Sequence, residues 1–296
     1  MNAAGGAVLR DHSLERRRLM LRGIGVILCG SVLLGAMAVA VRVATRTMDA
    51  GQVAFARFLG SFLILLALRG GRSLRPRGTV PPVLLRGLFG GGAILLYYRA
   101  IESAGAGLAT LLHCTYPIWT TVIATTVLGE RFDARLAAAL ALFIAGIAVV
   151  VAPGADLSQA TTIGSLYALT ASMLAGAAVS TARQLRAVES AYLVTTYFMA
   201  VGAALTAPAL LRGLPPISGQ LVVILMIIVL TSVAGQLLLH LGLGFAPAIQ
   251  ASLAAATAVV SATAFAGLLL GEHLDPHTLL GAGVLVVAIG LAVGRR

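Results

Sequence analysis

The same apolar unit occurs twice in this chain, displaced by about 141–142 residues. Residues 129–133, GERFD, return as residues 271–275, GEHLD, and Arg42 returns as Arg183. The displacement is nearly constant from one end of the unit to the other, and long apolar segments fill both copies. Two copies of a hydrophobic unit, each with short polar hairpins, indicate two similar halves that pack against each other inside a membrane.

The composition agrees with a membrane interior. Hydrophobic residues make up 59% of the chain and charged residues 10%, and the mean hydropathy is +0.99. A soluble domain carries about a quarter charged residues, so this chain could not cover a surface that faces water. Lipid offers no hydrogen bonds to the backbone, so helices, which satisfy their own backbone groups, are the expected elements. The 34 glycines suit close helix–helix contact in a bilayer.

The basic residues exclude several classes of protein. All 21 are arginines. Without lysine there can be no P-loop lysine for ATP and no lysine Schiff base. The net charge of +11 gathers at predicted helix ends, not in a basic patch with interleaved aromatics, so nucleic acid is not an expected partner. Neither clustered aspartates nor histidine-rich boxes occur, so we expect no enzyme, no metal site and no cofactor.

We predict an all-α integral membrane protein with ten transmembrane helices, arranged as two inverted five-helix repeats. An N-terminal cytoplasmic arm, residues 1–20, precedes a first repeat at 21–152 and a second at 162–294. Only this arm and the segment 69–82 are polar enough to form substantial loops. Most apolar segments approach the roughly 20 residues that cross about 30 Å of hydrocarbon. The predicted spans are 21–44, 50–68, 82–101, 104–127, 132–152, 162–184, 189–211, 217–241, 246–269 and 274–294.

The arginines also predict orientation. An odd number of spans per repeat requires the second copy to enter the membrane in the opposite direction. The 69–77 loop carries four arginines and its counterpart at 210–218 carries one, which places the first loop in the cytoplasm. Both ends of the chain are basic, so both termini are predicted to lie in the cytoplasm. The membrane is predicted to be the inner (cytoplasmic) cell membrane. Arg42 and Arg46 disagree, because they fall on the predicted outer side.

Short motifs in both halves carry a family resemblance. They are residues 97–101 (YYRAI), 104–112, Pro117-Ile118 and 128–132 (LGERF) in the first copy, and 242–253 and 270–272 in the second. Together they resemble the EamA branch of the drug/metabolite transporter superfamily. Val259 stands where the second copy would repeat the proline. The resemblance implies ten helices in inverted repeats, alternating access without ATP, and a central cavity lined by the third, fourth, eighth and ninth spans. It also implies small metabolites, amino acids among them, as substrates.

Charged side chains inside the spans are candidates for substrate binding. Each costs roughly 2.5–3.5 kcal/mol on insertion scales, so each needs a reason. Arg57, which matches an arginine common in the family's second span, either holds a substrate carboxylate or tethers helices through backbone carbonyls. Arg99 and Glu102 lie on one helix face, which favours either a local ion pair or a proton-binding carboxylate beside an anion contact.

Aromatic residues and a histidine gather in the third and fourth spans. His113 lies one turn before Pro117 and can relay protons near neutral pH, or can be a hydrogen-bonded packing residue. Pro117 removes a backbone hydrogen bond and is predicted to kink the fourth span and so to assist gating. Tyr98, Tyr116 and Trp119 are candidates for stacking on a planar substrate or closing a gate, and the alternative is an interfacial belt.

The second half supplies further polar candidates. Gln236 and His240 lie four residues apart on the eighth span and Gln250 lies early in the ninth, so we predict that these side chains bind substrate in the cavity. Glu130 and Glu272 occupy the repeated hairpins. We interpret both as structural, because acids near helix starts cap amides and complement the helix dipole.

The leading functional prediction is a secondary active transporter that exports small organic metabolites such as amino acids. The substrate would bind between the repeats, and Glu102 or His113 is our hypothesis for coupling to protons. Two alternatives stay open: a carrier of nucleotide-sugar or lipid-linked substrates, and a passive channel. A monomer or weak homodimer is expected, because a self-contained pair of repeats does not require a partner.

Overall fold

The computed structural model describes residues 3–104, 106–151, 162–216, 218–271 and 276–294. Every regular element in these ranges is a helix, as the composition predicted. The predicted seam between the repeats, 153–161, lies outside the described residues. The helices are α1 (Ala3–Ala44), α2 (Ala50–Ala67), α3 (Val80–Ala104), α4 (Ala106–His113), α5 (Tyr116–Thr126), α6 (Ala134–Val151), α7 (Thr162–Leu185), α8 (Ala191–Thr206) with the 3₁₀ helix η3 (Ala207–Arg212), α9 (Gly219–Leu243), α10 (Ala248–Ala256), α11 (Ala258–Leu270) and α12 (Pro276–Val293).

Nine spans in the described ranges are long and apolar enough to cross a membrane, with α10 and α11 together making one of them. They match nine of the ten predicted segments. The other predicted segment, 104–127, is divided into α4 and α5, each too short to cross alone. The chain is therefore a multi-pass membrane protein, and the count of ten stays a prediction.

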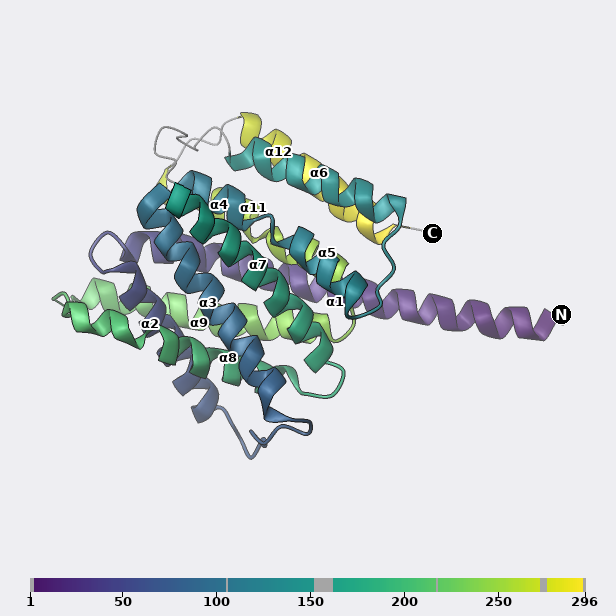
Figure 1. Ribbon diagram of the computed structural model, residues 1–296, viewed down its shortest axis with the longest axis horizontal. Coiled ribbons are helices and arrows are strands. Elements are labelled where there is room, and N and C mark those ends of the chain that lie inside the picture. The colour runs from purple at the N-terminus through teal and green to yellow at the C-terminus, as the bar shows by residue number, and fades with distance from the viewer. Residues whose placement is uncertain (1–2, 105, 152–161, 217, 272–275, 295–296) are drawn as a thin grey trace.

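The N-terminal arm differs from the expectation of a loop. Helix α1 runs without interruption from Ala3 to Ala44 and projects beyond the other helices (Figure 1). The expectation was wrong because polarity was taken as the sign of a loop. The arm is rich in leucine, arginine and alanine, which are strong helix formers whether or not they are buried.

The packing of the helices is nearly unchanged when the two halves are exchanged. Helix α1 lies along α9, and the equivalent α7 lies along α3. In the same way α1 contacts α11 and α7 contacts α5, whereas α2 pairs with its counterpart α8, and α6 with α12. The last pair forms a separate two-helix layer at the top of Figure 1. The helices of each half are therefore buried largely against helices of the other half.

Glycines allow the closest of these approaches. On the seam between α1 and α9, a Cβ atom on Gly30 would lie 2.8 Å from the carbonyl oxygen of Gly235. One on Gly23 would lie 2.8 Å from the carbonyl oxygen of Gly242. Small residues at a seven-residue spacing on both helices thus let the two backbones touch, as membrane helices commonly do.

Both halves contain a helix interruption at an equivalent place. Helix α4 is separated from α5 by Cys114 and Thr115, and α10 is separated from α11 by Thr257. Each threonine Oγ1 donates to the carbonyl oxygen three residues earlier, at 2.6 Å to Leu112 and 2.6 Å to Ala254. Pro117 follows the first interruption, as a predicted kink would require, but the second has no proline. The shared feature is the threonine hydroxyl, which competes for the backbone acceptors of the helix.

Candidate functional site

Two arginines are buried within the spans of the first half. Arg57 on α2 is 4% exposed, and Arg86 on α3 is 5% exposed. Among the residues that the structure describes, no carboxylate forms an ion pair with either guanidinium. A buried charge without a counter-ion is costly, so these two sites call for an anion that the chain itself does not provide there.

Arg57 contacts side chains from both halves. Its Nε donates to the Oγ of Ser232 on α9 at 2.9 Å. Its guanidinium carbon lies 5.1 Å from the centroid of the Phe58 ring. The side chain of Tyr98 on α3 lies close enough to interact electrostatically with the guanidinium. Arg57 therefore lies where α2, α3 and α9 meet.

Arg86 has fewer partners. Its Nη2 lies 3.1 Å from Nε2 of His240 on α9, and its guanidinium carbon lies 4.3 Å from the centroid of the Phe198 ring. Its Nε and Nη1 are buried and have no hydrogen-bond partner in the described part of the chain. Buried donors are almost always paired in folded proteins, so these N–H groups are suited to bind an anionic ligand or water.

The contacts of His240 define its tautomer. Thr195 Oγ1 donates its proton to the carbonyl oxygen of Ala191 at 2.7 Å, and the same oxygen lies 2.8 Å from His240 Nδ1. Arg86 can only donate, so His240 Nε2 is the acceptor of their contact, and the single ring proton lies on Nδ1, which donates to the Thr195 hydroxyl oxygen. Nε2 is then left with a lone pair that accepts from Arg86. His240 is neutral in this arrangement, so the guanidinium of Arg86 carries the only charge of the Arg86–His240 pair.

Sequence analysis missed Arg86. The third span was predicted to begin at residue 82, directly after four loop arginines, so Arg86 resembled another positive residue at a helix end. Helix α3 in fact begins at Val80, which places Arg86 almost two turns inside. The available signal was its apolar surroundings, since Leu84, Leu85 and Leu88 flank it.

A cavity of about 560 Å³ lies near the opposite end of α3. Three predicted binding residues, Tyr98, Arg99 and Glu102, line it. Arg99 and Glu102 form an ion pair at 3.0 Å, and Asp49 and Arg212, also in the lining, form another at 2.7 Å. All four charged side chains are partly exposed, so the cavity has a solvated, charged rim and reaches inward to Tyr98.

The predicted aromatic group around the α4–α5 interruption also comes together. The His113 ring stacks on Tyr97 with centroids 4.6 Å apart, and Tyr116 lies 6.1 Å away. Nδ1 of His113 is buried without a partner among the described residues. Trp119 packs instead against α7 at Gly176, where a Cβ atom would lie 2.6 Å from the Cβ of Trp119. Trp119 therefore lies at the seam between α5 and α7.

The two predicted glutamines occupy separate places. Gln236 lies on α9, one turn from Ser232 and one turn from His240, between the partners of the two buried arginines. Gln250 lies in the first turn of α10. The Oε1 atoms of both side chains are buried without a hydrogen-bond partner among the described residues. Gln236 is thus part of a polar stripe that joins the two arginines.

Glu130 links the halves. Its Oε1 accepts from the N–H of Ala248 at 2.6 Å, and its Oε2 accepts from the N–H of Ile249 at 3.2 Å. These are the first amides of α10, so the carboxylate caps a helix of the other repeat rather than the helix that follows it. Asp133 caps that following helix. The equivalent Glu272 lies outside the described residues.

The loop between α2 and α3 is fixed to the second half near His240. Glu189 Oε1 accepts from the N–H groups of Arg77 at 2.6 Å and Gly78 at 2.9 Å. Arg186, between α7 and α8, donates to the carbonyl oxygen of His240 at 2.8 Å. Burial, and to a lesser extent a neighbouring arginine, lowers the pKa of Arg186. This end of the bundle is therefore rich in arginines close to the Arg86–His240 pair.

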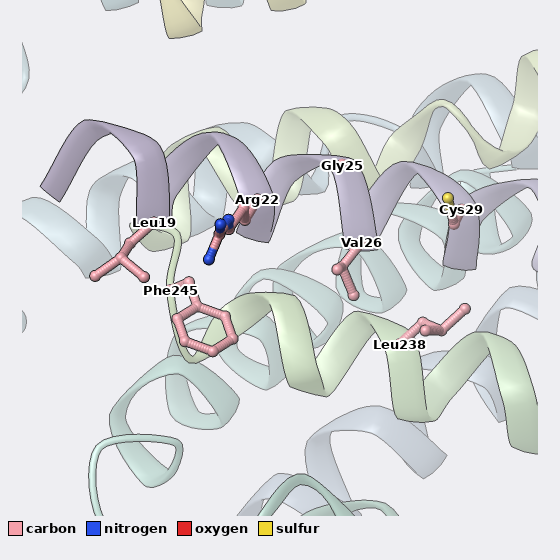
Figure 2. A pocket seen from close by; sticks show the side chains of 7 residues that line it. All are labelled: Leu19, Arg22, Gly25, Val26, Cys29, Leu238 and Phe245. Atoms are coloured by element: carbon pink, nitrogen blue, oxygen red, sulfur yellow. The ribbon is translucent and has the colours of Figure 1, made fainter. Parts of the chain in front are cut away.

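A second cavity is apolar and lies apart from this network. It measures about 540 Å³ and lies between α1 and α9. Figure 2 shows Arg22 and Phe245 toward one end of it and Cys29 and Leu238 toward the other.

Apolar helices that pack in exchangeable pairs around buried polar residues are typical of membrane transporters built from two repeats. The chain belongs to the EamA-like transporter family, whose model matches residues 21–152 and 162–294. It is accordingly a transporter and not an enzyme.

Several known proteins are similar along most of the chain. The chain is 27% identical over 283 residues to the pseudopaline exporter CntI of Pseudomonas aeruginosa, which covers 94% of this chain and 97% of the relative. CntI from a second strain of that species matches equally well. An uncharacterized transporter of Archaeoglobus fulgidus is 26% identical over 192 residues, covering 64% of this chain and 67% of the relative. A crystal structure of a protein with 17% identity has a TM-score of 0.77, over 91% of this chain and 96% of that one, and shares the fold.

Proposed function

We propose that this protein exports small organic metabolites that carry a carboxylate group across the cytoplasmic membrane. The observation that carries the proposal is Arg57, a buried guanidinium at the junction of both halves with no carboxylate partner in the described residues. Arginine is suited to planar carboxylates, because its N–H groups form a rigid fork that matches two carboxylate oxygens.

The surroundings of Arg57 support a substrate site. Tyr98 both lines the charged cavity and reaches Arg57, so it connects the cavity to the buried cation. Ser232 brings α9 of the second repeat to the same point. A substrate held here would contact both repeats, and movement of one repeat against the other would expose it to either side.

The comparisons support export as the direction of transport, and the helix packing supports alternating access by two inverted repeats. A relative that matches almost the full chain is named an exporter. The exchangeable pairing of α1 with α9 and α7 with α3 is what two inverted repeats would produce. Positive charge on the α2–α3 loop supports placing that loop, and both termini, in the cytoplasm.

Counterflow in proteoliposomes tests the proposal. Proteoliposomes that contain the purified protein would be loaded with one unlabelled compound at a time. The same compound in labelled form would then be added outside, and its accumulation inside would be measured. The panel would comprise methionine, threonine, succinate, a nucleobase, a quaternary amine and a nucleotide sugar. The amide of each accumulating acid, such as methioninamide, would then be tested as a competitor, because it has nearly the same shape without the negative charge.

We expect saturable counterflow with one or more of the carboxylates and at least about tenfold weaker competition by the matching amide, since hydrogen bonds to charged groups contribute about 1.5–3 kcal/mol. Counterflow of the nucleobase or quaternary amine alone would overturn the proposal. Unsaturable downhill flux would favour a passive channel, and counterflow of the nucleotide sugar alone would favour that class of carrier.

A further inference from the structure

We propose that Arg86 and His240 form a second anion-binding site, which holds the substrate carboxylate before or after Arg57 does. The proposal rests on the proposed function, since it assumes a carboxylate substrate. It adds a separate site at the end of the bundle that carries the α2–α3 loop. A substrate leaving the cytoplasm would meet Arg86 first and Arg57 second.

The first argument is the unmet bonding capacity of Arg86. The side chain is 5% exposed, and among the described residues only its Nη2 has a hydrogen-bond partner, the neutral His240. The N–H groups of Nε and Nη1 have no partner in the described chain. With His240 neutral and no described carboxylate in reach, the pair carries one positive charge. A bound carboxylate would satisfy both the charge and the vacant donors.

The second argument is the polar stripe on α9. Ser232, Gln236 and His240 follow one another at intervals of four residues, so they lie on one side of the helix. Ser232 contacts Arg57 and His240 contacts Arg86. Eight residues of helix separate the two contacts by about 12 Å along the axis, from the rise of 1.5 Å per residue. Gln236 lies midway, with a buried Oε1 and no partner among the described residues, so its amide can contact a substrate that passes between the arginines.

The third argument is the pair of phenylalanine rings that contacts both arginines. The rings of Phe58 and Phe198 meet edge to face with centroids 5.4 Å apart, and they are 0% and 2% exposed. Arg57 lies over the Phe58 ring and Arg86 lies over the Phe198 ring. The two aromatic rings thus connect the two guanidinium groups through a continuous series of contacts. Because the contacts of the two arginines on α9 lie about 12 Å apart, a small carboxylate such as acetate is held by one guanidinium at a time, and the two arginines act in turn.

The surroundings also favour entry of an anion from this end. Arg186 donates to the carbonyl oxygen of His240 and is only partly buried. Glu189, an acid on the same α7–α8 loop as Arg186, is buried and already accepts two backbone N–H groups of the α2–α3 loop. The approach to Arg86 is therefore positively charged, which raises the local concentration of anions.

The test is a side-chain ¹⁵N NMR titration of histidine-labelled protein with sodium acetate. Acetate is small enough for a buried site, and acetamide and sodium chloride serve as controls for shape and ionic strength. The His240 signal would be identified by its loss in His240→Asn. The titration would be repeated in Arg57→Gln, in Arg86→Gln and in Arg86→Lys, which keeps the charge if glutamine impairs folding.

We expect a saturable acetate-dependent shift of the His240 Nε2 signal in the wild type and in Arg57→Gln, its loss in Arg86→Gln, and a weaker saturable shift in Arg86→Lys. Acetamide and chloride should leave the signal in place. No saturable shift in the wild type, or one that persists in Arg86→Gln, would overturn the second site. Carboxylate counterflow in the same wild-type preparation would then show that the proposed function survives without it.

Discussion

Replacing Glu130 with glutamine is expected to destabilise the contact between the two repeats. The carboxylate accepts two N–H groups at the start of α10, at 2.6 and 3.2 Å. Glutamine keeps one acceptor oxygen but loses the second acceptor and the charge. A hydrogen bond to a charged group contributes about 1.5–3 kcal/mol, and the favourable interaction with the helix dipole about 0.3–1 kcal/mol. We therefore expect a loss of about 2–3 kcal/mol, or roughly 4–6 °C in the unfolding midpoint of a chain this large.

Thermal unfolding of the purified protein in detergent measures this loss. Asp133→Asn is the matched control, because it removes the same charge from the same hairpin but affects the cap of its own helix, where Asp133 accepts from the N–H of Leu136 at 3.0 Å. Its cost should be about 0.3–1 kcal/mol, because asparagine is nearly as good an N-cap as aspartate and only the favourable interaction of the charge with the helix dipole is lost. Equal midpoints for the two variants, or a smaller shift for Glu130→Gln, would refute the idea that Glu130 joins the halves.

Three further changes have distinct expected outcomes. Glu189→Gln should loosen the arginine-rich loop between α2 and α3, so limited trypsin digestion should cleave that loop faster than in the wild type; an unchanged rate would contradict the anchoring role. Arg86→Met should raise the unfolding midpoint, since it removes a buried charge whose desolvation no counter-ion among the described residues offsets, and a lowered midpoint would argue that Arg86 is structural. Arg212→Gln breaks the exposed ion pair with Asp49 and should cost less than about 1 kcal/mol by the same measurement; a larger loss would show that this pair closes the bundle.

The helices could be predicted from sequence because length and hydropathy are local properties. The repeated hairpins at residues 129–133 and 271–275 gave the division into halves before any contact was known. Local patterns failed at the N-terminal arm, where charged residues form a helix. They also failed at Thr257, where a helix breaks without proline, because a threonine hydroxyl bonded to the backbone has no distinctive sequence pattern.

The site was less accessible because its contacts join distant parts of the chain. Arg57 could be selected because it lies well inside an apolar span. Its partner Ser232 is 175 residues away, and Arg86 and His240 are 154 residues apart. Such pairs depend on which helices pack together, and hydropathy does not specify this. The role of Glu130 was predicted as structural, but its target on α10 was visible only once the halves were assembled.

Transport by Arg57→Gln and Arg57→Lys is the most direct test that a buried guanidinium holds the substrate carboxylate. The two variants would be compared with the wild type in counterflow, with a labelled carboxylate that the wild type accumulates. Glutamine should raise the half-saturating concentration about 10- to 100-fold, because about 1.5–3 kcal/mol of charged hydrogen bonding is lost. Lysine should retain a measurable part of the affinity, because it keeps the charge without the fork. Unchanged half-saturation in Arg57→Gln would contradict the role of Arg57 as the carboxylate anchor.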